Sequence, residues 1–272
     1  GLSKSLAKKG VQITFVLPYS ADITNVDFIK LVPAANVKIK RVFSILQPYM
    51  TSQEYKKTLS DSKNGINKKI YGATLFDEVY RYTLAAEKIA EEEEFEVIHC
   101  HDWMTFGAGI AAKRKKNKPL VVHVHSTEFD RTGGKVVNQL VYDLEREGMH
   151  KADKIIAVSN FTKSKIITKY GINPEKIRVV HNAVDAQQQT GYQSENFEIK
   201  KRQRIVLFLG RVTLQKGPDY FVYAAKKVLE HEKNVRFIIA GSGDMEPFII
   251  EKAAELGIAD KVLFAGFLSQ ED

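Results

Sequence analysis

The alternation of short apolar runs with helical patterns constrains the fold of this chain more than any other feature. Nearly every apolar run is followed by residues with helical periodicity. Because parallel strands need a long crossover, usually a helix, this alternation predicts parallel sheets built from right-handed βαβ units. The expected strands span residues 11–18, 37–45, 95–100, 119–124, 154–159, 177–182, 204–210, 235–241 and 261–266. The expected helices span residues 1–9, 73–94, 105–116, 135–150, 160–169 (with Ser159 as N-cap), 218–232 and 245–256.

Two polar segments interrupt the alternation. Residues 183–203 have low hydrophobicity and many glutamines, which predicts a linker between a domain at 1–182 and a second one at 204–272. Three strands and two helices form a poor core alone, so the second domain is expected to be part of a longer one. Residues 46–70 are polar without a clear period and are expected to form an irregular loop.

Composition limits the class of protein. The chain has 272 residues, of which 44% are hydrophobic and 27% charged, as in soluble globular proteins. It contains no apolar run of about 18 residues, which argues against a membrane span. Cys100 is the single cysteine, which excludes an internal disulfide framework and suggests a reducing, cytoplasmic location.

The net charge of +8 permits an anionic partner, and its densest cluster is KRKKNK at residues 113–118. These cations fall at the expected C-terminal end of a helix, where the helix dipole favours them. A weak contact with an anionic membrane surface remains the alternative. No aromatic residues are interleaved with the cluster, so we expect no nucleic-acid partner.

The segment LFLGRVTLQKGPDYFVYAAK at residues 207–226 places two cations between a strand and a helix. Arg211 directly follows the strand, and Lys216 precedes Gly217 and Pro218 at the expected helix start. Ligands of open parallel sheets bind at the carboxyl ends of strands, and helix N-termini favour phosphate. The segment therefore predicts a site for a multiply charged phosphate ligand. A solvated basic loop is the alternative.

An ordered set of motifs gives a more specific indication. In chain order they are HCHDWMT (99–105), VVHVHSTEFDRTGG (121–134), ADKIIAVSNFTK (152–163), VVHNAVD (179–185), GRVTLQKG (210–217) and IAGSGDMEP (239–247). Together they resemble the GT-B glycosyltransferases of family 4, the group that includes glycogen and sucrose synthases, over nearly the whole chain. The resemblance implies two Rossmann-like parallel-sheet domains that face each other across a cleft, with the second domain truncated here.

The resemblance also implies roles for the second-domain loops. Arg211 and Lys216 are expected to bind the donor diphosphate and to stabilise the charge that develops on it during transfer. The family needs no metal at the diphosphate, so no cofactor and no metal are expected. Other expected donor-binding residues are Gly210, Gly241, Ser242 and Gly243. A tight turn leading to Asp244 as a helix N-cap would explain the two glycines of GSG equally well.

In the first domain, the resemblance places His125 beside the transferred sugar as a catalytic candidate. A structural histidine at a strand end is the alternative. The expected acceptor or cleft residues are His101, Asp102, Trp103, Glu128 and Arg131. An Asp–Trp pair could bind a sugar by hydrogen bonds and stacking. A capped helix start would also account for Asp102.

Two parts of the family pattern are absent from the sequence. The first strand with its glycine-rich turn would precede residue 1, and the motif of two glutamates that holds the donor sugar would follow Asp272. On this pattern the chain alone is expected to be inactive, and the family activity would belong to a longer parent.

The expected function is a retaining transfer of a hexose, first of all glucose, from a nucleotide-diphosphate sugar to a hydroxyl of a sugar or glucan. One alternative is a non-catalytic GT-B-like module that binds a nucleotide or glycan. A less favoured alternative is a metal-dependent hydrolase. Its ligands would be His99, His101, His123 and His125, because each pair shares one face of its strand.

Overall fold

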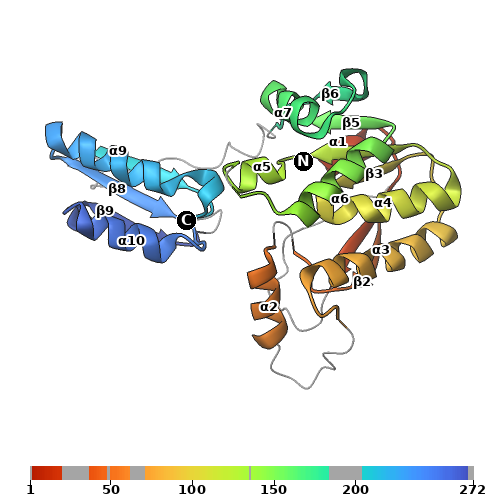
Figure 1. Cartoon of the computed structure of the whole chain (residues 1–272), viewed down its shortest axis with the longest axis horizontal. Coiled ribbons are helices and arrows are strands. Elements are labelled where there is room, and N and C mark those ends of the chain that lie inside the picture. Colours follow the sequence, from red (N-terminus) through yellow and green to blue (C-terminus); the bar gives the residue numbers. More distant parts are fainter. Residues whose placement is uncertain are drawn as a thin grey trace. The chain divides into compact units, whose positions relative to one another are not determined.

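The fold consists of two units, each of which combines helices with parallel strands (Figure 1). The computed structural model describes residues 2–19, 37–47, 50–61, 71–134, 136–183 and 204–268. The first unit comprises Gly1–Thr127 with Asn138–Asp185, and the second comprises Glu128–Val137 with Ala186–Asp272. From residue 184 onward, the predicted linker lies outside the described residues.

The first unit contains two parallel sheets. In the smaller sheet, β1 (Ile13–Tyr19) pairs with β2 (Val37–Phe43). The larger sheet follows chain order and contains β3 (Ile98–His101), β4 (Leu120–Val124), β5 (Lys154–Ala157) and β6 (Ile177–Val179). Every described pair in these sheets is parallel. The prediction of parallel sheets is therefore confirmed.

Helices connect these strands, and α4 packs against both α3 and α6. The contact is close because small residues lie within it. A Cβ added at Gly148 on α6 would lie 2.3 Å from Phe106 Cδ2 on α4. The fully buried Leu120, Val122 and Ile155 contribute the strand side of this core. The helices of the unit are α1 (Leu2–Lys8), α2 (Ser52–Asp61), α3 (Leu75–Glu92), α4 (Trp103–Lys116), α6 (Gln139–Lys151) and α7 (Asn160–Tyr170), with the 3-10 helix η1 (Pro174–Lys176).

The N-cap of α7 was predicted correctly. Ser159 Oγ accepts a hydrogen bond from the Thr162 N–H at 3.0 Å. Replacing an N-cap serine with alanine removes this bond and leaves a backbone N–H unpaired. We expect Ser159→Ala to lower the free energy of unfolding of the first unit by about 1 kcal/mol. Urea denaturation followed by circular dichroism would measure this change. Ser164→Ala on the same helix serves as control, and an equal loss there would contradict the capping explanation.

The prediction of an irregular loop over residues 46–70 is wrong for α2. The helix starts with a reciprocal pair in which the Thr51 N–H donates to Glu54 Oε2 at 2.7 Å and the Glu54 N–H donates to Thr51 Oγ1 at 3.2 Å. The T-x-x-E spacing of this capping box was the overlooked sequence signal. Tyr55 is fully buried and anchors the helix, because its hydroxyl donates to Gly72 O at 2.7 Å. Residues 48–49 and 62–70 of the expected loop lie outside the described residues.

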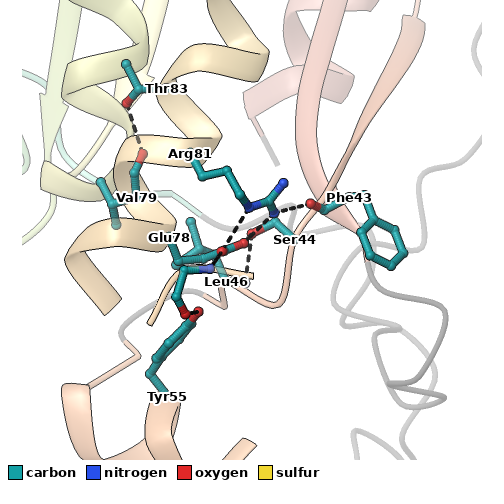
Figure 2. Close-up of polar contacts among 9 residues, drawn as sticks. Phe43, Ser44, Leu46, Tyr55, Glu78, Val79, Arg81 and Thr83 are labelled. Atoms are coloured by element: carbon teal, nitrogen blue, oxygen red, sulfur yellow. Dashed lines mark hydrogen bonds and ion pairs between the residues drawn. The ribbon is translucent and has the colours of Figure 1, made fainter. Parts of the chain in front are cut away.

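A buried carboxylate joins the start of α3 to the end of β2 (Figure 2). Glu78 is 0% exposed and accepts hydrogen bonds from Ser44 Oγ at 2.6 Å and from the Gly72 N–H at 2.7 Å. Arg81 forms an ion pair with it, and Nε of Arg81 lies 2.9 Å from Glu78 Oε2. The guanidinium also donates to the Phe43 carbonyl. The buried charge is therefore both paired and hydrogen-bonded, as burial of an ion requires.

The second unit contains one parallel sheet, with β7, β8 and β9 in chain order. Apolar side chains of β8 meet those of α9 and α10 in its core, where Val222, Phe237 and Ile249 are at most 2% exposed. Sequence patterns did not predict the four-residue α5, which is grouped with this unit. The elements are α5 (Glu128–Arg131), β7 (Arg204–Leu209), η3 (Leu214–Lys216), α9 (Pro218–His231), β8 (Val235–Ala240), α10 (Glu246–Glu255), η4 (Ala259–Lys261) and β9 (Val262–Gly266).

The basic cluster at residues 113–118 lies where predicted, at the C-terminal end of α4. Its cations form ion pairs with acidic side chains of the same unit. This pairing supports the interpretation of the cluster as the basic end of a helix over contact with a membrane. The ion pairs are Lys113 with Asp153, Arg114 with Glu87, Lys115 with Glu91, and Lys116 with Glu94. Each helix of the described ranges is too short or too polar to traverse a lipid bilayer.

Candidate functional site

The turn between β7 and α9 presents the two predicted cations. Gly210 has φ +145°, and no atom lies within 4 Å of the position that a Cβ would take. Arg211 is half-buried, and its Nη2 donates to Gln215 Oε1 at 3.2 Å. Lys216 is exposed at the end of η3, one residue before Gly217 starts the turn into α9. Sequence reasoning missed Gln215, because its spacing from Arg211 in a loop carries no periodic signal.

The turn between β8 and α10 is joined to this first turn by backbone hydrogen bonds. The Gly210 N–H donates to Ala240 O and the Val212 N–H to Ser242 O, both at 2.9 Å. A Cβ added at Gly241 would lie 1.9 Å from Gly210 O, and one at Gly243 would lie 2.3 Å from Val212 O. Both glycines are therefore required by the close approach of the two turns.

The start of α10 corrects one alternative for the GSG segment. The helix is capped by Met245, without a side-chain hydrogen bond, and Asp244 is not its N-cap. Instead, the Met245 N–H donates to Val212 O at 3.0 Å, which ties the helix start to the turn after β7. Gly210, Arg211, Gly241, Ser242 and Gly243 thus form one connected backbone unit at the carboxyl ends of β7 and β8. A role for these glycines in contacting a donor stays a prediction.

In the first unit, Asp102 connects the ends of β3 and β4. Its Oδ1 accepts from the His125 N–H at 2.8 Å, while its own N–H donates to His123 O at 3.0 Å. Asp102 has φ +56°, and its side chain makes no capping bond to α4 although it occupies the N-cap position. The interpretation of Asp102 as a helix cap is therefore not supported. Its carboxylate positions the backbone of His125.

Trp103 is 6% exposed, and its ring lies against Phe76 with a centroid distance of 5.8 Å. The ring packs in the core between α4 and α3. This burial does not support the predicted stacking of Trp103 on a sugar, because a bound sugar needs an accessible ring face. The apolar pattern after Asp102 already allowed a core position, but it did not distinguish between the two roles.

His99 and His101 of β3, His123 of β4, and His125 just after β4 form a stack of four rings. Ring centroids are 4.6 Å apart for His99 and His101, 5.0 Å for His101 and His123, and 4.3 Å for His123 and His125. His101 Nδ1 lies 2.9 Å from His125 Nε2, within hydrogen-bond distance. The expectation that each pair shares a face is confirmed, and His101 lies beside His125.

Three of the stacked rings, those of His99, His101 and His123, are held in the neutral form. Burial, reinforced by the neighbouring imidazoles, lowers the pKa of His101 to about 3 and that of His123 to about 4. Burial also lowers the pKa of His99. At neutral pH these three side chains therefore offer lone pairs on uncharged nitrogens.

Glu128 and Arg131 lie on α5, which the fold groups with the second unit, whereas His125 lies in the first unit. Within α5, Arg131 Nε lies 3.2 Å from Glu128 Oε2, and the Glu128 side chain is buried. This pair stabilises the short helix. A contact of either residue with an acceptor stays a prediction.

Comparison with known proteins identifies the relatives of the chain. It is 31% identical over 187 residues to an uncharacterized glycosyltransferase of Methanocaldococcus jannaschii, covering 65% of this chain and 48% of the relative. It is 30% identical over 199 residues to D-inositol 3-phosphate glycosyltransferase of Gordonia bronchialis. This match covers 66% of this chain and 43% of the relative. The chain thus spans about half the length of the curated relatives it matches.

Solved structures show the same fold at low identity. Sucrose-phosphate synthase of Thermosynechococcus elongatus aligns with a TM-score of 0.66 at 16% identity, covering 99% of this chain and 64% of that one. Anabaena HepE in complex with UDP and glucose aligns with a TM-score of 0.58 at 16% identity. This alignment covers 86% of this chain and 57% of HepE. The fold is that of the GT-B glycosyltransferases.

Family models match consecutive parts of the sequence. Residues 191–272 match the model described as Glycosyl transferases group 1. Residues 1–188 match the model described as Glycosyltransferase Family 4, so the chain belongs to glycosyltransferase family 4.

Proposed function

We propose that the protein is a retaining hexosyltransferase. It moves a hexose, with glucose as the first candidate, from a nucleotide-diphosphate sugar to a hydroxyl of a sugar or glucan. Family membership supports the reaction class. Two solved structures of HepE support the donor class, because one is a complex with UDP and glucose and the other a complex with UDP-glucose. A cytoplasmic location stays a prediction.

The observation that carries the proposal is the connected pair of turns at residues 210–217 and 241–243. Backbone bonds fix their geometry, and the first turn carries Arg211 and Lys216 as well as Gly210, whose Cβ position is open. Breaking the bond between the anomeric carbon and the diphosphate develops negative charge on the leaving oxygens. A guanidinium and an ammonium held in place before the reaction stabilise that charge without reorganisation.

In this proposal His125 contributes to the sugar side of the reaction. Asp102 holds its backbone and His101 contacts its ring. This arrangement fixes the imidazole so that it can hydrogen-bond a sugar hydroxyl. Asp102 and His101 act on the substrate through His125, as positioning residues.

The diphosphate contact is tested by binding. UDP, ADP, GDP and their glucose conjugates are titrated calorimetrically into the full-length protein. For whichever ligand binds, we expect Arg211→Ala and Lys216→Ala each to weaken binding at least tenfold, because each removes a charge-assisted contact. We expect about a 100-fold loss of turnover, since each cation also stabilises the developing charge.

Lys227→Ala is the matched control, because Lys227 is an exposed cation on α9. Equal weakening by all three substitutions would contradict specific binding of the diphosphate by Arg211 and Lys216. It would indicate that the general positive charge of the protein attracts the ligand. Tight diphosphate binding without turnover in the full-length protein would instead favour the non-catalytic module.

We also propose that no divalent metal acts at the diphosphate, because the two cations already supply its counter-charge. After treatment with EDTA and removal of the chelator, the affinity for the diphosphate should stay within twofold. A tenfold loss that Mg²⁺ or Mn²⁺ restores would show that a metal shares this task.

A further inference from the structure

The register of the larger sheet brings three imidazoles of the first unit together. His101 lies directly opposite His123 in the parallel pairing of β3 with β4, and His99 lies two residues before His101 on the same face. One ring nitrogen from each of the three lies within 4.8 Å of the others. The proposed transfer reaction uses neither His99 nor His123.

His123 lacks polar partners. Its side chain is 7% exposed, and within the described residues neither Nδ1 nor Nε2 has a hydrogen-bond partner. His99 Nε2 is likewise buried without such a partner. Leaving buried polar atoms unpaired is unfavourable, so these nitrogens are directed toward something other than the protein's own donors and acceptors.

We propose that His99, His101 and His123 bind a divalent transition-metal ion of the zinc class. Neutral imidazole nitrogens are preferred ligands of Zn²⁺, Ni²⁺ and Cu²⁺, whereas Mg²⁺ and Ca²⁺ require oxygen. Three histidines leave a fourth tetrahedral position for water or another ligand. All three ligands belong to the first unit, and their proposed role does not depend on the proposed transferase function.

The geometry is compatible with closure on an ion. Nitrogens bound at 2.0–2.1 Å to a tetrahedral zinc are about 3.4 Å apart. Binding therefore requires the three stacked rings to rotate from their present orientation until their in-plane lone pairs converge on the ion. His125 supplies the outer contact that metal-bound histidines usually have. When His101 binds the metal through Nε2, its Nδ1–H can donate to His125 Nε2 across the observed 2.9 Å. The metal and the ring of His125 are thereby linked.

The experiment uses the purified full-length protein after metal removal. Titration with Co²⁺ should produce visible d–d absorption with a stoichiometry of one, and Zn²⁺ should displace it. We expect His123→Gln and His99→Gln each to weaken Zn²⁺ binding at least tenfold, since each removes one of three ligands. His181→Gln, at an exposed histidine of the same unit, should leave the affinity unchanged.

His99 is less buried than His123, so its variant keeps the test valid even if His123→Gln fails to fold. Absence of Co²⁺ absorption would overturn the proposal. So would Zn²⁺ binding that His99→Gln leaves unchanged, or a loss of equal size in His181→Gln. None of these outcomes tests Arg211 and Lys216. The proposal of metal binding and the proposal of diphosphate binding can therefore be contradicted independently.

Discussion

Gly241→Ala should unfold most of the second unit and abolish binding of a nucleotide diphosphate. The glycine has φ +135°, which L side chains rarely adopt, and an added Cβ would lie 1.9 Å from Gly210 O. The backbone around both turns would have to move apart. That movement would break the bonds from the Gly210 N–H to Ala240 O and from the Gly241 N–H to Gly266 O.

The expected loss exceeds the cost of backbone strain alone. A residue in a conformation essentially reserved for glycine costs about 1–3 kcal/mol, and the clash with a carbonyl oxygen adds to it. We therefore expect a loss of about 3 kcal/mol or more in the free energy of unfolding. Thermal denaturation, with hydrogen exchange of the β7 and β8 amides, would measure it.

Gly257→Ala separates strain from clash. Gly257 also has positive φ, at +66°, but no atom lies within 4 Å of its Cβ position. Gly257→Ala should lower the free energy of unfolding by only about 1 kcal/mol. If Gly241→Ala is as mild as this control, then the two turns are not held together as the structure indicates.

Much of the fold could be predicted from the sequence because its strands and helices are locally periodic. Every expected strand and helix has a counterpart among the described elements, within a few residues at the ends. Within the described ranges, the two α-helices that were not predicted, α2 and α5, were missed for different reasons. In α2 the capping box at Thr51 and Glu54 was overlooked. In α5 four residues are too few to show a period.

For the candidate site, the sequence could predict only which residues follow the ends of strands. Loop position singled out Arg211 and Lys216 as candidates, and the family resemblance singled out His125; the roles of all three stay predictions. Loop position could not show that Gly241 lies against Gly210, because that contact depends on the pairing of β7 with β8. Nor could it show that Trp103 is buried against Phe76, since an aromatic residue at a helix start fits either role. Tertiary packing decides both questions.

The second large effect is expected at Glu78 in the first unit. Glu78→Ala removes the carboxylate and leaves Arg81, the Ser44 hydroxyl and the Gly72 N–H without this acceptor (Figure 2). Removing one partner of a buried ion pair costs about 3–5 kcal/mol. Urea denaturation at pH 7 should show a loss of that size. Glu87→Ala on the same helix removes an ion pair with the exposed Arg114 and should cost about 1 kcal/mol or less.

The pH dependence of stability gives an independent test of the same network. Burial acts to raise the pKa of Glu78, but hydrogen bonds from Arg81, Gly72 and Ser44 outweigh it and hold the pKa below the ordinary 4.5. A carboxyl group with a depressed pKa stabilises the fold above its unfolded pKa. This stabilisation is lost as the pH falls through the folded pKa. Between neutral pH and about pH 4.5 the contribution should therefore be constant, and below that it should decline. Glu78→Gln should flatten this decline in stability below about pH 4.5. If the stability of Glu78→Gln and of the native protein declines identically at acid pH, the carboxylate does not stabilise the fold through its charge.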